Sequence, residues 1–499
     1  MVDHRSAAMG ILGFVCLAFL SVPAASSDEP SAEQRITELS QEVENLRKLV
    51  LQLQAEMAAQ RALSAPPATA ATAPAQGTAP TQPDAPTSIV ATAASSPGVA
   101  SPSASPSAGA PAAAFQSTAG LLQGMTVNAM LDGYYEYNTN APIGRVNYLR
   151  AYDVSSDSFS LNQADLVLES APDPSSGKRA GARIDLQYGQ ATASLQGNPA
   201  NEPRPEIYRS IFQAYGTYVF PLGNGLSVDF GKWASSLGLE GNYTKDQTNY
   251  SRSLWFDYLP FYHMGLRAKY PINDVLTVNA WITNGTEQTE AFKNYKDRLL
   301  GLVLTPTPRI SWTVNYYEGQ EHPDVTYLPA SASEPAPAQG GQTLPNQQGT
   351  YILPIANAPD GKLQILDSYA TWQASTAVTL SAEADYVQQR LYSYSTPLHV
   401  AGGAIYGAYQ LSPTVALGAR AEYLADSGGL FSGAPQYLKE GTLTIDYRPT
   451  DGFLMRGEYR RDQSNQRFFL SNTLGVLDTS QPTFTLGLVW WVGQKEGTW

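Results

Sequence analysis

The chain has very little cysteine and histidine for its length. Cys16 is the only cysteine among 499 residues, and there are four histidines. Cys16 lies in an apolar run near the N-terminus, so the rest of the chain has no disulfide and no thiol chemistry. The sequence also lacks the patterns of a zinc protease, a serine hydrolase or a phosphate-binding loop. We therefore expect no enzyme, no metal site and no cofactor, although a pair of catalytic carboxylates stays open.

Long hydrophobic runs are absent as well. Beyond the N-terminus no apolar run reaches the roughly 18 residues that a membrane-spanning helix needs. The run Met9–Leu20 is shorter than that, follows Arg5, and precedes the small residues Ala24 and Ala25. This arrangement predicts a signal peptide over residues 1–25 rather than a membrane anchor. A membrane barrel remains open, because its strands alternate polar and apolar residues instead of forming such runs.

Residues 31–62 have the apolar spacing of a coiled coil. Steps of three and four alternate over about three heptads. Residues 63–120, which follow, are rich in Ala, Pro, Ser and Thr and predict an extended linker without a core. With no core nearby to pack against, the helix is expected to associate with copies of itself. The oligomerisation positions are Ile36, Leu39, Val43, Leu46, Val50, Leu53 and Met57.

From residue 124 onward the chain alternates polar and apolar residues as β-strands do. In TLTIDYR, Leu443, Ile445 and Tyr447 share one face, and the threonines and charged residues share the other. GARIDLQY and VTLSAEADY show the same pattern. A half-buried strand of a soluble sandwich alternates in this way too. Alternation alone therefore leaves both a sandwich and a membrane barrel open.

The connections decide between these two folds. We expect about sixteen strands, and short turns such as PLGNG, PIND and RPTDG alternate with long connections. An outer-membrane barrel with short periplasmic turns and long outer loops must show this alternation. We therefore predict an all-β, transmembrane antiparallel β-barrel over residues 124–499, with both ends on the periplasmic side. The long connections are residues 138–157, 189–206, 235–260, 285–296, 319–362, 389–399, 425–437 and 462–481.

Aromatic residues near the predicted strand ends favour the same fold, because outer-membrane barrels carry aromatic girdles at both membrane interfaces. In the last strand, PTFTLGLVWWV, Phe484, Leu486 and Val492 are predicted to face lipid, and Thr483 and Thr485 to face the interior. This strand resembles the C-terminal signal that the barrel assembly machinery reads. The girdle candidates are Tyr134, Tyr135, Tyr137, Tyr215, Tyr218, Trp490 and Trp491.

Two stretches of the barrel region carry a family resemblance. GKWASSLGLE (231–240) and NYSRSLWF (249–256), followed by Pro260 and Gly265, resemble the OmpL-like beta-barrel porin family. The resemblance implies an outer-membrane pore in a Gram-negative bacterium, with membrane lipid and the barrel assembly machinery as partners. The heptads and linker resemble the periplasmic extensions of some trimeric porins, so a homotrimer is favoured. Peptidoglycan is a further candidate partner, and no nucleic acid is expected.

A barrel of about sixteen strands is wide enough for an aqueous lumen, so the expected function is passive diffusion of small hydrophilic solutes and ions. The third outer loop of general diffusion porins commonly folds inward, and here the third long connection, about 235–260, contains EGNYTKDQTNYSRSLWFDYLP. We predict that its ions form the pore constriction and set selectivity. These constriction residues are Glu240, Lys245, Asp246, Arg252 and Asp257. The predicted lumen-facing residues on strands are Arg183, Asp185, Arg267, Lys269, Arg420, Asp446 and Arg448.

Charge predicts the ion preference only weakly. The chain has a net charge of −13, and residues 124–499 keep −9 of it, because the preceding residues carry nine acids and five bases. A net-acidic barrel is expected to show a weak cation preference or none. The alternative function is a tethering barrel that attaches to the cell wall through its N-terminal extension.

Overall fold

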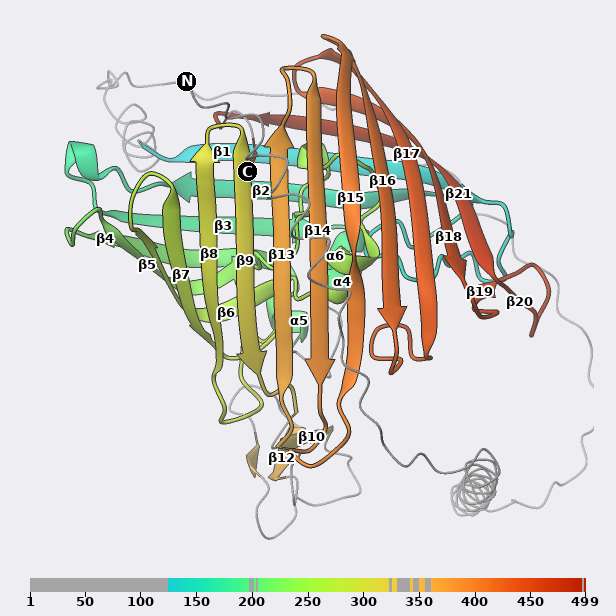
Figure 1. Ribbon diagram of the computed structural model, residues 1–499, viewed down its shortest axis with the longest axis horizontal. Helices are drawn as coiled ribbons and strands as arrows, with labels where there is room; N and C mark the ends of the chain where they lie inside the picture. The colour runs from blue at the N-terminus through green and yellow to red at the C-terminus, as the bar shows by residue number, and fades with distance from the viewer. Residues whose placement is uncertain are drawn as a thin grey trace, which may run out of the picture. The chain divides into compact units, whose positions relative to one another are not determined.

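Sixteen strands form one closed antiparallel barrel, as the sequence predicts (Figure 1). The computed structural model describes residues 124–196, 202, 205–322, 325–329, 342–343, 350–354, 360–495 and 498–499. The barrel strands are β1 (Thr126–Asn138), β2 (Ser158–Ser170), β3 (Ala180–Tyr188), β4 (Ile211–Phe220), β5 (Leu226–Ala234), β6 (Tyr262–Pro271), β7 (Leu276–Thr283), β8 (Asp297–Thr307), β9 (Ile310–Gly319), β13 (Leu363–Gln373), β14 (Val378–Gln389), β15 (Leu398–Ser412), β16 (Val415–Asp426), β17 (Gln436–Thr450), β18 (Phe453–Ser464) and β21 (Ser480–Gly493).

The first and last strands close the ring. Each strand pairs with its neighbours along the chain, and β1 pairs with β21 over a register that includes Leu131 opposite Trp490. Closure leaves no free sheet edge, which is the condition for strands to cross a membrane. Among the described residues, no helix has both the length and the apolar composition to span a bilayer.

The two faces of the barrel wall have opposite chemistry. Along β21, Phe484, Leu486 and Val492 are exposed, whereas Thr483 and Thr485 are buried. The same alternation of exposed apolar and buried polar residues recurs in the other strands, for example in β16 and β17. The outer face is therefore apolar and the interior polar, which is the reverse of a soluble protein and suits a surrounding of lipid.

Short turns and long loops alternate around the ring. Short turns join β4 to β5, β6 to β7, β8 to β9 and β17 to β18, whereas the connection from β9 to β13 contains β10 (Val325–Pro329), β11 (Gln342–Thr343) and β12 (Thr350–Pro354). Figure 1 shows the β8–β9 turn and the β10–β12 sheet at opposite ends of the strands. The remaining elements are η1 (Pro174–Ser176), α4 (Gln190–Gln196), α5 (Pro205–Tyr208), η2 (Thr244–Asp246), α6 (Leu254–Tyr258), β19 (Phe469–Leu470) and β20 (Leu477–Asp478).

Three of the predicted girdle aromatics lie on the inner face of the barrel instead. Tyr134 is buried, donates its hydroxyl to Gln190 Oε1 at 2.5 Å and contacts the ring of Tyr250. Tyr215 pairs across the sheet with Arg183, which places it on the inner face. Trp491 pairs across the sheet with buried Met130 and packs against an interior cluster. The prediction was wrong for these three because nearness to a strand end does not set the direction of a side chain. Residue parity sets it, and parity turns Tyr135 outward.

The predicted signal peptide (1–25), coiled coil (31–62) and linker (63–120) fall outside the described residues. They stay predictions, as does the self-association through the heptad positions.

Candidate functional site: loop L3 inside the barrel

Residues 235–261, here called L3, connect β5 to β6 and fold into the interior of the barrel. Tyr250 and Trp255 are fully buried within this loop. Ser253 caps α6, because its hydroxyl accepts a hydrogen bond from the Phe256 backbone N–H at 2.9 Å. Figure 1 shows α6 within the ring of strands. The absence of a regular period in this stretch follows from its irregular path between the walls.

L3 crosses the lumen to the strands farthest from its own ends. In the ring order, β16 is the eighth strand after β5, which is half of the circumference. Arg420 of β16 donates to Ser251 O at 2.8 Å, and Arg456 of β18 donates to Asn249 O at 2.9 Å. The loop therefore spans the interior instead of lying against the wall from which it starts.

Carboxylates of the wall accept the backbone N–H groups of L3. Glu458 of β18 accepts from the N–H of Tyr250 at 2.6 Å and of Ser251 at 2.9 Å, and Glu422 of β16 accepts from Leu254 N–H at 2.9 Å. Irregular backbone at membrane depth is tolerated only where its polar groups find such partners. Hydrogen bonds to a charged acceptor contribute about 1.5–3 kcal/mol each, so they hold the loop firmly.

Glycines on two inward-facing strand positions leave room for L3. A Cβ atom at Gly418 would lie 2.6 Å from Thr248 O, and a Cβ atom at Gly487 would collide with the ring of Tyr250. Tyr250 is fixed in turn, because its hydroxyl donates to Asp132 Oδ1 at 2.9 Å. The backbone of β16 and β21 thus approaches L3 more closely than any other residue type would permit.

The predicted constriction residues lie in L3, but their charges are engaged within the barrel. Glu240 accepts from Arg420 at 2.8 Å. Lys245 pairs with Asp246 at 2.7 Å, and burial lowers the pKa of Lys245 although Asp246 acts in the other direction. Arg252 donates to the carbonyl oxygens of residues 241, 242 and 250 at 2.7–3.0 Å and stacks on Tyr152. Its guanidinium therefore supports the shape of the loop.

Asp257 in α6 is a half-buried acid whose charge interacts with the buried guanidinium of Arg460. Burial raises the pKa of Asp257 to about 7, while Arg460 acts to lower it and Asp153 to raise it. Its carboxyl is therefore expected to change its charge near neutral pH.

The predicted lumen-facing residues divide into two groups. Arg183 with Asp185, and Arg420 with Glu422, form ion pairs of 2.9 and 3.0 Å inside the barrel. The other group lies nearer the short turns and is more accessible to solvent. Arg267 pairs with Asp229 and Asp446 pairs with Arg456, each at 2.7 Å, while Lys269 and Arg448 are exposed.

Sequence reasoning missed the wall groups that hold L3. Arg460, Glu422 and Glu458 were not among the predicted site residues, yet all three contact the loop or its anchors. A signal was available, since these residues occupy inward positions of strands in the segments GARAEY and RGEYRR. The alternation along each strand could have predicted that these side chains face inward. It does not predict that they contact L3.

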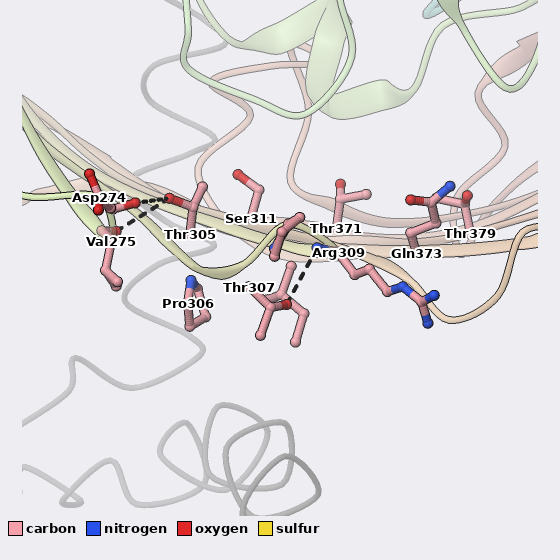
Figure 2. A pocket seen from close by; sticks show the side chains of 12 residues that line it. Asp274, Val275, Thr305, Pro306, Thr307, Arg309, Ser311, Thr371, Gln373 and Thr379 are labelled. Atoms are coloured by element: carbon pink, nitrogen blue, oxygen red, sulfur yellow. Dashed lines mark hydrogen bonds between the residues drawn. The ribbon is translucent and has the colours of Figure 1, made fainter.

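An open cavity of about 600 Å³ lies at the short-turn end of β7–β9, β13 and β14, and its lining includes Val275, Pro306 and Ile310 as well as polar residues. Figure 2 shows Ser311, Thr371 and Thr379 pointing to one side of the strands, and Pro306 and Thr307 to the other. Hydroxyl groups dominate the first set. The cavity therefore offers hydrogen bonds to passing water and solutes rather than the grouped acids and bases of a catalytic centre.

A closed barrel with an apolar exterior, a polar interior and a loop across its lumen defines the porin class of outer-membrane proteins. The family model described as "Putative beta-barrel porin-2, OmpL-like" matches residues 124–490. The chain belongs to this family, and its barrel is accordingly an outer-membrane porin barrel.

Solved structures resemble this chain in fold at low sequence identity. Outer-membrane OmpT of Vibrio cholerae has 11% identity and a TM-score of 0.44, with 74% of this chain and 97% of that chain covered. An anion-selective porin from Comamonas acidovorans has 8% identity and a TM-score of 0.45, covering 74% and 99%. The outer-membrane channel DcaP of Acinetobacter baumannii has 10% identity and a TM-score of 0.44, covering 74% and 97%. No curated protein matches the chain.

Proposed function

We propose that the protein is a diffusion porin in which L3 narrows the passage for small hydrophilic solutes and ions. The observation that carries the proposal is the path of L3 to β16 and β18, which are eight and ten strands after β5 in a ring of sixteen. A segment tied at both ends and in its middle reduces the free cross-section at that height. The polar inner wall then provides hydrogen bonds to what passes beside it.

The size of the passage is tested by removing the middle of the loop. Residues 241–252 are replaced by a short Gly/Ser linker, and single-channel conductance of the full-length protein is recorded in planar bilayers. The matched control shortens the β16–β17 connection, residues 427–435, which is another long loop. We expect larger conductance steps only for the L3 variant. Equal steps in wild type and the L3 variant would refute the constriction, and an absence of steps in all three proteins would favour the tethering function.

The ion preference is expected to be weakly cationic or absent. Residues 124–499 carry a net charge of −9. A negative interior raises the local concentration of cations. The reversal potential across a KCl gradient measures this preference directly. A reversal potential of the sign for chloride would contradict it.

Self-association through the heptad positions 36–57 belongs to the same proposal. Deleting residues 31–60 is expected to reduce the oligomer mass measured by light scattering in detergent. An unchanged mass would assign the association to the barrel instead.

A further inference from the structure

Three inward-facing carboxylates meet where L3 begins. They are Asp367 of β13 and Glu383 and Asp385 of β14, and one oxygen atom of each lies within 4.8 Å of the others. All three residues are buried. Asp367 and Asp385 are directly opposite each other in the β13–β14 register. Like charges in that position repel each other and destabilise a sheet, so the arrangement calls for a positive partner.

The recorded partners of these carboxylates are all uncharged. Asp367 accepts from Gly238 N–H at 3.1 Å and from Asn315 Nδ2 at 2.7 Å. Glu383 accepts from Leu239 N–H at 2.9 Å and from the Tyr406 hydroxyl at 3.1 Å. Within the described part of the chain, no lysine or arginine forms an ion pair with any of the three acids.

Among the described residues, Asp385 has no hydrogen-bond partner outside the cluster, and only the carboxyl group of Asp367 lies against its own. Its side chain is buried, with the residue only 5% exposed, and neither carboxylate oxygen accepts a hydrogen bond. A buried carboxylate without a partner is costly, because it loses its hydration without compensation. One of its oxygens lies within 4.8 Å of an oxygen of Asp367 and an oxygen of Glu383. The cluster therefore combines the donor atoms of a cation site with an unsatisfied group directed into it.

We propose that Asp367, Glu383 and Asp385 bind one divalent cation of the hard, oxygen-preferring class, for which Ca²⁺ is the best fit. Calcium binds carboxylate oxygens at about 2.3–2.6 Å and accepts irregular geometry, so oxygens on opposite sides of the ion lie up to about 5 Å apart. The 4.8 Å span of the cluster lies within that limit. Magnesium demands about 2.0–2.1 Å in a regular octahedron and is the poorer fit.

The cation would join the wall to the loop. Asp367 and Glu383 already accept the backbone N–H groups of Gly238 and Leu239, the residues at which L3 enters the lumen. Bound Ca²⁺ removes the repulsion between β13 and β14 while leaving these two hydrogen bonds in place. This site is independent of the proposed diffusion function, since binding is measured without a membrane potential or a solute.

The test is calcium binding by the full-length protein folded in detergent. Isothermal titration with CaCl₂ and thermal unfolding with and without CaCl₂ are compared for wild type, Asp385→Asn, Glu383→Gln and Asp229→Asn. Asp229→Asn is the matched control, because it removes the same charge from the inner wall at an acid paired with Arg267 at 2.7 Å. Migration of unheated protein on gels verifies that each variant is folded.

We expect wild type and Asp229→Asn to bind one Ca²⁺ and to melt at a higher temperature in its presence. Asp385→Asn and Glu383→Gln are each expected to bind at least about tenfold more weakly, because a charged ligand is lost. The proposal is overturned if wild type shows no binding, or if both cluster variants bind as tightly as Asp229→Asn. A calcium-insensitive wild type that Asp385→Asn stabilises would also overturn it, since the acids would then share a proton.

Discussion

Two parts of the barrel wall hold the same loop with different arrangements of charge. On β16–β18, Arg420, Arg456 and Arg460 alternate with carboxylates. A guanidinium or an L3 N–H is the partner of Glu422, Glu440, Asp446, Glu458 and Asp462. We call this region the arginine wall. On β13 and β14, Asp367, Glu383 and Asp385 have no such cation among the described residues. We call this region the acidic wall.

The two walls should therefore differ in how the loss of one charged side chain affects stability. A buried ion pair adds little net stability, but the removal of one partner leaves a buried charge that costs several kcal/mol. The arginine wall should therefore be sensitive to the loss of any single member. Neutralisation of one acid in the acidic wall should not destabilise the fold, and added divalent cations should change its stability instead. Predictions that separate the walls follow, from the largest effect to the smallest.

Arg420→Met is expected to have the largest effect. The guanidinium of Arg420 contacts Glu240, Glu422 and Glu440 at 2.8–3.2 Å, and all of these side chains are buried. Its removal should destabilise the fold by about 3–5 kcal/mol, because three buried carboxylates lose their cation. Urea unfolding in lipid vesicles, followed by tryptophan fluorescence, measures the change.

The control for this variant is Arg267→Met. Arg267 pairs with Asp229 at 2.7 Å in a more accessible position, with 22% of its side chain exposed. Its loss should cost only about 1 kcal/mol or less, as is usual for a pair in contact with water. Equal shifts of the unfolding midpoint for both variants would remove the distinction between the arginine wall and the rest of the interior.

Glu458→Gln tests the hydrogen bonds of the arginine wall without a change of shape. The carboxylate accepts the N–H groups of Tyr250 and Ser251, and the amide supplies a weaker acceptor for only one of them. We expect a loss of about 1–3 kcal/mol and greater current noise in single-channel records, because the middle of L3 is released. Glu169→Gln, at a carboxylate that pairs with Lys495 at 2.9 Å, should leave the noise unchanged.

Gly487→Ala tests how closely L3 packs on β21. The added methyl group collides with the ring of Tyr250, so we expect a loss near the lower end of the ~1–3 kcal/mol typical of overpacking. The control is Gly457→Ala, where the methyl group meets only Ile445 Cγ2 at 3.4 Å on the lipid side. Tyr250→Ser removes the ring, so Gly487→Ala should cost less stability in that background than in wild type. A double-mutant cycle of urea midpoints should therefore show that the two changes are non-additive. Additive losses would show that the ring and the glycine do not interact.

The strands were predictable from sequence, but the site was only partly so. Alternation located the sixteen strands closely, because the inner and outer faces of a barrel impose a strict period of two on every strand. The loop order pointed to residues 235–260 as the candidate segment. The partners of the loop could not be predicted, because the contact of Tyr250 with Glu458 or of Arg252 with Tyr152 depends on how an irregular segment crosses the lumen.

The same limit applies to the predicted role of Arg252 in the constriction. A charged residue in a pore loop suggests a group that faces passing ions. Composition cannot distinguish such a group from one whose hydrogen bonds all go to the backbone of its own loop. Arg252 donates to Gly241 O, Asn242 O and Tyr250 O. Only the backbone path shows that these carbonyl oxygens converge on one guanidinium.

The smallest expected effect is a pH dependence that comes from Asp257. Burial raises its pKa to about 7, above the value of about 3.9 in an unfolded chain. The folded state therefore holds this proton more tightly than the unfolded state. Stability should decline as the pH rises from about 4 to about 7 and should then stay level with respect to this group.

Asp257→Asn isolates this contribution. Asp153 opposes it at lower pH, since Arg150 and then Arg460 hold its pKa below the usual value although burial acts to raise it. Asp153 therefore acts below about pH 4, and the comparison of urea midpoints between pH 5 and 8 reports on Asp257 when wild type is measured beside the variant. Asp257→Asn should be less sensitive to rising pH than wild type over this range, and its reversal potential should no longer shift between pH 6 and 8. Identical pH profiles would assign the titration near neutral pH to another group and leave Asp257 without a role in selectivity.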